Sequence, residues 1–582
     1  MDNSLRLDWN RVAMALPSRA EELQNATEAF ADTVFIDTLK AKQNQIIYGR
    51  RGTGKTHLLK RLEEEYISKF KDYRVVPIFI NGSKLRRQAN IIVEIPQAVA
   101  LSLYIEFIKT LVSNLHEFIN SQLEVTILDK IFIGKQTQTA KKAQAISKEL
   151  YDLFVTGEVR FLPAGEASDE VQTLNETAAK VSNGISLNLS DPRSLGWKVD
   201  LSSGREKAAK KSGVRFRKIK GQVILPFSQV AKNIQEMLTL LDGASLVVLF
   251  DEWSDIDQRL DTQPYLADMI KRTLSSITKM HVKLACIPIR TLLATPITPS
   301  NPIPIGYEEG DDISADVDLD SIVYIQNDLK QFLPFFITLI KRHMGMSLEW
   351  VKSMEILEFE KFICNEIFNG LEVFSELCQA SAGVPRDFLQ LFRNVTSIQV
   401  SSKQSNINLV HIRTAAAKLH ESKKHSFIPE SLELTILDNI YRSIVAKHKT
   451  YLFLVKENRS LHPAIQMLWA ERLIHKMPAL YYDSNTHIRY IYYLMDYGEC
   501  VDLLSSEAEK SGIEKGKKMA DSIPESEFHS SGWVAVFTTA AKIFLPITMG
   551  YVEKRLALSN SPAGNLAPDP KNIIVDDAIF KI

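Results

Sequence analysis

Residues Gly49–Thr56 constrain the fold of this 582-residue chain more than any other feature. They lie in the segment IIYGRRGTGKTHLLKRL and satisfy the spacing G-x-x-x-x-G-K-[ST] in full. A short apolar run, NQIIYG, precedes them, and KTHLLKRLEEEY follows with Leu58, Leu59 and Leu62 on one helical face. Glycines let backbone N–H groups approach an anion, and a helix N-terminus adds a positive dipole end. The segment therefore predicts a strand, a phosphate-binding loop (the P-loop) and a helix in direct succession.

The residue types in this loop suit a nucleoside triphosphate with Mg²⁺. Lys55 would reach the β- and γ-phosphates, and the Thr56 hydroxyl would ligate the metal. A chance glycine turn ahead of an amphipathic helix is the alternative, and the register of strand, loop and helix disfavours it. We expect ATP and Mg²⁺ as cofactors, bound by Gly49, Arg50, Arg51, Gly52, Thr53, Gly54, Lys55, Thr56 and His57.

A second strand that ends in carboxylates is predicted by the segment ASLVVLFDEWSD. Its continuous apolar run ends in Asp251 and Glu252, and such runs are typical of central parallel strands buried on both faces. Ligands bind at the carboxyl ends of these strands. Asp251 would contribute with Thr56 to the coordination shell of Mg²⁺, and Glu252 would polarise the attacking water. An ordinary strand followed by an acidic turn is the alternative.

These motifs together resemble AAA+ ATPases. The paired carboxylates resemble the Walker B box, HVKLACIPIRT resembles the sensor 1 strand, and SAGVPRDFLQLF resembles the sensor 2 element with Arg386 facing the nucleotide. The combination resembles the origin-recognition-like initiator clade, in a bacterial-type relative, over roughly Phe35 to Leu504. The resemblance implies ATP hydrolysis by an α/β P-loop core, a parallel sheet flanked by helices, with an all-α lid and a C-terminal winged-helix domain.

The sequence departs from this pattern in three ways. Lys55 and Asp251 lie 196 positions apart (251 − 55), which predicts a large insertion after the strand RVVPIFING. The sensor 1 position has no asparagine, so Arg290 and Thr291 are the candidates there. Arg272 and Arg290 are the candidates for an intersubunit arginine finger, and a surface salt bridge is an equal alternative for Arg290. The predicted catalytic residues are Glu252, Arg386 and Arg290.

Composition and pattern divide the chain into five expected segments. The acidic stretch TPITPSNPIPIGYEEGDDISADVDLD is expected to leave the nucleotide core toward the lid, and it lacks the spacing of a calcium-binding loop. The segments are a helical lead-in at 1–34, the nucleotide-binding core at 35–320 with a large basic insertion at about 135–222, the lid at 321–424, the winged helix at 425–504, and a small α/β tail at 505–582, in which IIVDDAIF could add a strand.

Nucleic acid contact is predicted only locally, because 70 Lys and Arg balance 70 Asp and Glu over the whole chain. Dense basic segments suit the phosphate backbone of duplex DNA. A solvated basic loop is the alternative for the insertion, and protein docking is the alternative for the winged helix. The candidate DNA-binding residues are Arg205, Lys207, Lys210, Lys211, Arg215, Arg217, Lys218 and Lys220 in the insertion, and Arg472, Lys476 and Arg489 in the winged helix.

Several classes of protein are disfavoured. The four cysteines are scattered without Cys-x-x-Cys or Cys/His spacing, which argues against a zinc site or a disulfide framework and fits a reducing cytosol. The N-terminal stretch lacks the apolar core of a secretory signal, and no uninterrupted run of about 18 apolar residues predicts a membrane span. We therefore expect a cytoplasmic protein that does not associate with membranes.

Two functions stay open on this basis. The first is an ATP-driven molecular switch on double-stranded DNA that acts as a sensor or loader with a separate effector protein. For this function the resemblance implies a plasmid, mobile-element or antiviral (phage-defence) setting. The second is a signalling ATPase that forms homo-oligomers and binds a protein partner without DNA. The balanced charge of the chain favours the second, and the basic insertion favours the first.

The assigned roles predict different defects for two substitutions. Lys55→Ala should weaken ATP binding itself, because it removes the ammonium that contacts the phosphates. Glu252→Gln should retain ATP binding and lower turnover by about a hundredfold or more, because it removes the general base. Equilibrium nucleotide titration and phosphate release measure the two effects separately. Equal hydrolysis by wild type and Glu252→Gln would contradict the assignment of Glu252.

Overall fold

The fold is that of a computed structural model of the chain. It forms two compact units, which we describe separately. The sheet unit comprises Val34–Tyr48 and Leu58–Val317, and the C-terminal unit comprises Gly49–His57 and Asp318–Ile582. The structure describes residues 35–89, 96–125, 133–152, 160–163, 187–188, 197–200, 220–224, 227–257, 260–299, 302–320, 329–402, 406–448, 451–483, 486–504, 574–576 and 579.

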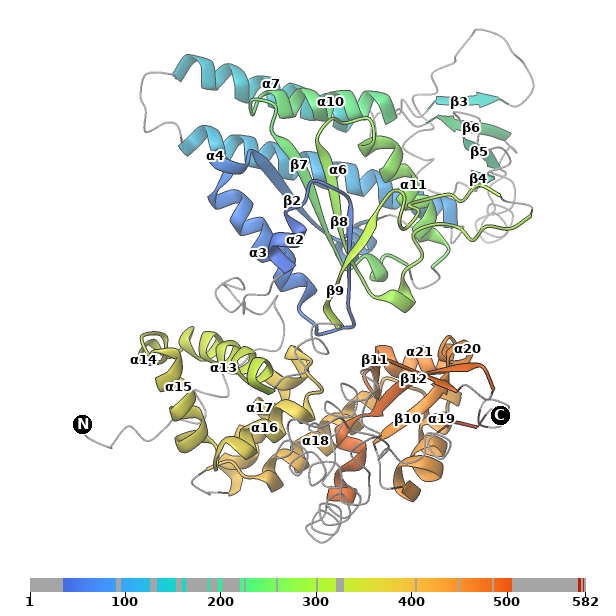
Figure 1. The fold of residues 1–582 in the computed structure, drawn as a ribbon. Coiled ribbons are helices and arrows are strands. Elements are labelled where there is room, and N and C mark those ends of the chain that lie inside the picture. The colour runs from blue at the N-terminus through green and yellow to red at the C-terminus, as the bar shows by residue number, and fades with distance from the viewer. Residues whose placement is uncertain are drawn as a thin grey trace, which may run out of the picture. The chain divides into compact units, whose positions relative to one another are not determined.

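A five-stranded sheet forms the centre of the sheet unit, with the strand order β2-β7-β8-β1-β9 (Figure 1). β2, β7, β8 and β1 run parallel to their neighbours. All seven residues of β7 are buried, as the continuous apolar run predicts for a central strand. The strands are β1 (Gln45–Tyr48), β2 (Val75–Asn81), β7 (Ser245–Asp251), β8 (Met280–Cys286) and β9 (Ser314–Asp318). The predicted parallel sheet flanked by helices is confirmed.

Helices cover this sheet, and one of them forms much of the core. In α6 the side chain of Phe107 stacks on Phe250 of β7 with ring centroids 6.1 Å apart. By length and hydropathy Pro96–Gln122 could cross a membrane, but 61% of its most apolar window is buried within the protein, as in a core helix. The helices are α2 (Phe35–Leu39), α3 (Lys55–Ser68), α4 (Phe70–Tyr73), α5 (Gly82–Gln88), α6 (Pro96–Val125), α7 (Ile133–Asp152), α10 (Phe227–Thr239) and α11 (Thr262–Leu274).

The expected insertion contains a helix, α7, and a small antiparallel sheet with the order β3-β6-β5-β4. Its strands are β3 (Arg160–Pro163), β4 (Leu187–Asn188), β5 (Trp197–Asp200) and β6 (Lys220–Ile224). Lys220 begins β6 and pairs with Asp200 across the sheet. The other seven basic residues predicted to contact DNA here lie outside the described residues.

The acidic stretch that was expected to leave the core ends in a strand of the core. Its last residues form β9, which lies beside β1 in the central sheet. Ser314 donates its backbone N–H to the carbonyl of Asn44 (3.1 Å), and the ring hydroxyl of Tyr48 donates to Glu309 (2.9 Å). Lys271 of α11 forms an ion pair with Asp312. Part of the stretch is therefore built into the sheet unit rather than solvated.

Helices fill the first half of the C-terminal unit, as the lid prediction requires. Aromatic rings dominate their packing, and the rings of Phe336 and Phe388 lie 4.2 Å apart between centroids. The helices are α13 (Leu329–Gly345), α14 (Glu349–Lys352), α15 (Ile356–Phe362), α16 (Leu371–Ala380), α17 (Pro385–Ser402) and α18 (Leu409–Lys424).

The second half of this unit, residues 432–504, is called the C-terminal domain below. It follows the order helix, strand, helix, hairpin, which is the order expected of a winged helix, and its sheet has the antiparallel order β10-β12-β11. The winged-helix assignment stays a prediction. The elements are α19 (Leu432–Ile440), β10 (Leu452–Lys456), α20 (Glu457–Ser460), α21 (Pro463–Ala470), β11 (Ile474–Asp483) and β12 (Ile488–Met495), followed by a 3-10 helix (Tyr497–Leu504).

The end of the chain returns to the C-terminal domain. Ile574 forms a parallel bridge with Leu454 of β10, and the backbone N–H of Val575 donates to the carbonyl of Leu454 (2.8 Å). The Val575 side chain is 1% exposed. The segment IIVDDAIF was expected to add a strand, and a short strand-like contact forms there.

This buried contact predicts a loss of stability on substitution. Val575→Asp should lower the free energy of unfolding of the C-terminal domain by about 2 kcal/mol, because it places a carboxylate in an apolar site. Val410→Asp is the matched control, because Val410 of α18 is 67% exposed. Thermal unfolding of the full chain measures the stability of both variants. Equal melting temperatures for the two variants would show that the Val575 contact contributes nothing.

Candidate nucleotide-binding site

The P-loop connects β1, which ends at Tyr48, to α3, which begins at Lys55. Gly52 and Gly54 have φ angles of 89° and 102°, a region that favours glycine. The Thr53 hydroxyl donates to the carbonyl of Arg50 (3.0 Å) and helps to close the turn. The strand, the glycine conformations and the helix start thus all occur where the motif predicts them.

Lys55 lies over its own loop. Its Nζ donates to the carbonyl oxygens of Gly49 and Arg50, the second at 2.9 Å. Thr56 and His57 follow in the first turn of α3. A phosphate bound by this loop would compete with those two carbonyls for the ammonium, and a charged acceptor makes the stronger hydrogen bond.

Arg386 lies beside the P-loop, as the sensor 2 resemblance implies. It is the second residue of α17, and its backbone N–H donates to the carbonyl of Gly52 (3.2 Å). A Cβ at Gly52 would lie 2.7 Å from the Cβ of Arg386. Glycine is therefore required at position 52 both for its φ angle and for this close approach. The catalytic role of Arg386 stays a prediction.

Arg50 does not direct its side chain toward a ligand. Its side chain is fully buried, and its Nε donates to Asp320 Oδ1 (2.8 Å) while its backbone N–H donates to Asp320 Oδ2 (2.9 Å). The carbonyl of Arg51 accepts from Arg472 Nη1 (3.0 Å). Arg50 was predicted to bind nucleotide, and this placement instead commits both its guanidinium and its backbone N–H to a protein carboxylate.

The two predicted carboxylates lie in the sheet unit at the end of β7. Asp251 is fully buried and is in register with Asn81, the last residue of β2. Glu252 has a left-handed backbone (φ 54°, ψ 40°), and its Oε2 accepts from Asn81 Nδ2 (2.9 Å). Asn81 Oδ1 accepts from the backbone N–H of Lys84 (2.9 Å) and so caps α5. Asn81 therefore fixes the position of Glu252.

Sequence reasoning missed Asn81. The signal that could have revealed it is the Asn-Gly pair that ends RVVPIFING, because it places a polar side chain at the carboxyl end of a buried strand. Gly82 allows the close approach, since a Cβ there would lie 2.4 Å from the carbonyl oxygen of Glu252.

Uncharged polar side chains form hydrogen bonds around the segment that resembles sensor 1, at the end of β8. Gln263 of α11 accepts from Trp253 Nε1 (3.1 Å) and donates to the carbonyl of Arg290 (2.9 Å). The hydroxyls of Ser254 and Thr291 lie 2.9 Å apart, so Thr291 connects the end of β8 to the Walker B turn. Arg272, an arginine-finger candidate, pairs with Asp268 within α11 (2.7 Å).

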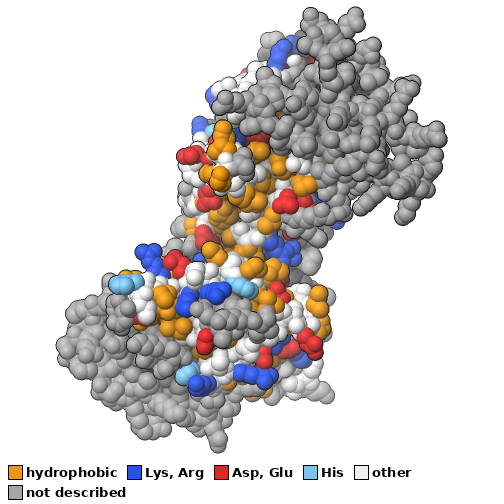
Figure 2. All heavy atoms as spheres, turned by 90° about the vertical axis from the view of Figure 1, so that its right-hand side faces the viewer, with side chains coloured by type: hydrophobic (Ala, Val, Ile, Leu, Met, Phe, Trp, Pro, Cys, Tyr) orange, Lys and Arg blue, Asp and Glu red, His pale blue; other side chains and the backbone are white. Residues whose placement is uncertain are grey.

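The predicted DNA contacts in the C-terminal domain differ in exposure. Lys476 of β11 and Arg489 of β12 are exposed. Arg472 was predicted to contact DNA; its side chain is instead 12% exposed and donates to Asp387 (3.1 Å) and to the P-loop. In Figure 2 the coloured part of the visible face mixes basic, acidic and apolar side chains without a continuous basic area.

Comparison with known proteins supports the identification of the core. Residues 15–256 match the family model described as ORC-CDC6-like. Both the P-loop and the paired carboxylates lie inside this range, and the match confirms the resemblance predicted from them. No curated protein shows significant similarity to the sequence.

Solved structures also show similarity. Drosophila ORC bound to DNA is 12% identical, with a TM-score of 0.29 over 86% of this chain and 92% of that chain. The Aeropyrum pernix ORC1 protein in complex with DNA is 11% identical, with a TM-score of 0.28 over 85% and 96%. The Aeropyrum pernix ORC2 protein, in ADPNP–ADP complexes, is 12% identical, with a TM-score of 0.25 over 84% and 92%.

The hydrogen bond between Asn81 and Glu252 predicts a pH-dependent defect. Asn81→Asp retains the cap of α5 but places a second carboxylate against Glu252, which raises the pKa of the pair because neighbouring like charges cannot both ionise. Turnover near neutral pH should fall about tenfold and recover as pH rises, with nucleotide affinity unchanged. Asn81→Ser, which also retains the cap, is the control without the added charge. A pH–rate profile of Asn81→Asp parallel to that of Asn81→Ser would refute this account.

Proposed function

We propose that this chain, whose residues 15–256 match the ORC-CDC6-like family model, is an ATP-hydrolysing molecular switch. One observation carries the proposal. The P-loop joins β1 to α3 with Gly52 and Gly54 in conformations that favour glycine, and the buried Asp251 ends β7 with Glu252 directly after it. ATP hydrolysis needs a phosphate-binding loop and carboxylates of this kind. ATP would shift the chain toward the conformation that binds it more tightly, and hydrolysis would release that conformation.

The residues present fit ATP with Mg²⁺. Asp251 offers a buried carboxylate at the carboxyl end of a parallel strand, and Thr56 offers a hydroxyl; both supply the oxygen ligands that Mg²⁺ requires. The metal would neutralise phosphate charge. Lys55 would exchange its loop carbonyls for phosphate oxygens. Glu252, oriented by Asn81, would accept a proton from the attacking water. Arg386 would add positive charge near the transferred phosphoryl group.

Duplex DNA is the partner that we propose for this switch. The order of elements in the C-terminal domain supports it, because a winged helix places a helix in the major groove. Lys476 and Arg489 are exposed on the strands of its hairpin, where they could meet phosphates. The resemblance to initiators extends the proposal to homo-oligomers, to a separate effector protein, and to a plasmid, mobile-element or phage-defence setting. A cytoplasmic location belongs to the proposal, because scattered cysteines without metal-ligand or disulfide spacing fit a reducing compartment.

A protein partner in place of DNA is the second candidate function. Leu480 and Tyr482 of β11 are 57% and 52% exposed on the same hairpin. Exposed apolar side chains at such a tip suit a protein surface better than a phosphate backbone. On this alternative, ATP controls oligomerisation and partner docking.

Binding of labelled duplex DNA by the Glu252→Gln protein, with and without ATP–Mg²⁺ across a salt series, decides between the two. We expect ATP-dependent binding that weakens steeply with salt. Lys476→Glu with Arg489→Glu, and separately reversal of the basic cluster in the insertion, should each reduce the salt slope by roughly one for every phosphate contact removed. An absence of binding under all conditions would reject the DNA proposal and favour the protein partner.

A further inference from the structure

Arg50 extends from the P-loop into the C-terminal domain. Its Nη1 lies 3.2 Å from His475 Nδ1 and 3.4 Å from each of the carbonyl oxygens of Trp469 and Ile474. The guanidinium also lies over the Trp469 ring, 5.4 Å from its centroid. One side chain of the phosphate-binding loop thus contacts the end of α21 and the start of β11.

Arg472 makes the reciprocal contact. It comes from the turn between α21 and β11 and reaches the P-loop carbonyl of Arg51 (3.0 Å). The same side chain donates to Asp387 (3.1 Å), which follows Arg386 in the first turn of α17. Arg472 therefore joins the P-loop to the start of the sensor 2 helix.

Buried charges behind these two arginines connect them. Lys423 Nζ lies 3.0 Å from Asp387 Oδ2 and 2.9 Å from Asp496 Oδ1. Asp496 also accepts from His475 Nε2 (3.2 Å) and from His420 Nδ1 (2.6 Å). Burial opposes ionisation of Asp496, but Lys423 and the two histidines outweigh it and hold the pKa of this carboxyl well below its usual value. The Asp496 carboxylate is thus charged and paired.

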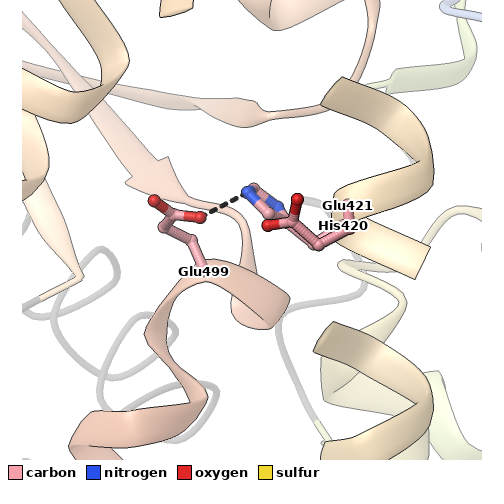
Figure 3. A group of neighbouring side chains, drawn as sticks. All are labelled: His420, Glu421 and Glu499. Carbon is pink, nitrogen blue, oxygen red and sulfur yellow. Dashed lines mark ion pairs between the residues drawn. The ribbon is translucent and has the colours of Figure 1, made fainter. Parts of the chain in front are cut away.

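The network ends at the side chains of His420, Glu421 and Glu499, shown in Figure 3. Their ligand-type atoms lie within 4.8 Å of one another, a grouping that could suit a metal. However, Lys424 donates to both glutamates, and Glu499 lies 2.6 Å from His420 Nε2. Because their charges are already neutralised by protein cations, we interpret this group as an ion-pair cluster.

We propose that the C-terminal domain holds the P-loop in its phosphate-binding form through Arg50 and Arg472, so that this domain sets the affinity for nucleotide. The proposal rests on the nucleotide binding proposed above. Arg472 and His475 are then positioning residues, which act on the nucleotide through the loop. A loop held in the bound conformation loses less conformational freedom on binding, and this preorganisation raises affinity.

The bonding pattern defines the charge state of His475. Arginine only donates hydrogen bonds, so His475 Nδ1 accepts from Arg50 and its Nε2–H donates to Asp496. Burial, assisted by the charges of Arg50 and Lys423 and opposed by Asp496, lowers the pKa of His475 from 6.5 to about 4. Because the folded-state pKa is lowered, this contact stabilises the loop above about pH 6.5 and is lost as pH falls toward about 4.

Arg472→Gln in the full chain tests the contact with the loop carbonyl. Asp387 keeps Lys423 as a partner in this variant, so the buried carboxylate stays paired. The Kd for a fluorescent ATP analogue with Mg²⁺ should rise about tenfold, equivalent to one charge-assisted hydrogen bond. Arg472→Lys should recover part of the affinity. Arg442→Gln is the matched control, because Arg442 is 76% exposed and pairs with Asp438 at the surface.

His475→Gln tests whether His475 acts by positioning the P-loop or only by stabilising the folded protein. A glutamine amide can accept from Arg50 and donate to Asp496, but it does not titrate. We expect nucleotide affinity close to wild type near neutral pH, and a smaller loss of affinity than wild type as pH falls from about 6.5 toward about 4. Thermal unfolding at each pH verifies that the variants stay folded.

The outcomes distinguish this inference from the function on which it rests. Suppose that wild type binds the analogue and Lys55→Ala does not. If Arg472→Gln and His475→Gln then both match wild type at every pH, the coupling is refuted and the nucleotide site stands. If wild type and Lys55→Ala both fail to bind, the proposed function and the coupling are rejected together.

Discussion

The buried ion pair between Arg50 and Asp320 is the interaction on which the C-terminal unit most depends. Both side chains are almost fully buried, and the backbone N–H of Arg50 adds a second bond to the same carboxylate. Removing one partner from a buried pair leaves an uncompensated charge that costs about 3–5 kcal/mol. The loop after β1 and the chain that leaves β9 must therefore stay together, although 270 positions separate the two residues.

The two groups of candidate nucleotide residues are held by different kinds of interaction. In the sheet unit, parallel strand register places Asn81 beside Asp251, and hydrogen bonds of the Asn81 side chain orient Glu252 and cap α5. In the C-terminal unit, charged side chains hold the P-loop from outside. The first arrangement follows from backbone geometry, whereas the second depends on ion pairs and on the charge states of buried groups.

This difference explains what the sequence could predict. The P-loop and the β7 carboxylates were predictable because strand, loop and helix patterns are local. Asn81, Asp320 and His475 were not, because each acts on a residue far away in the chain. Arg472 was assigned to DNA because a basic residue on an expected winged helix suggests phosphate contact; only the fold shows that Asp387 and the P-loop hold it. The role of the insertion was equally unpredictable, because a dense basic run suits both DNA and solvent.

Thermodynamic linkage would couple nucleotide binding at the P-loop to partner binding at the C-terminal domain. If nucleotide binding favours one form of the P-loop, and the C-terminal domain stabilises that form through Arg50 and Arg472, the two sites share one coupling free energy. Coupling of this kind is reciprocal. Any partner that bends the turn between α21 and β11 must then change nucleotide affinity, and nucleotide must change the affinity for that partner by the same factor. Duplex DNA and a protein partner satisfy this relation equally, so the coupling does not depend on which of them the hairpin binds.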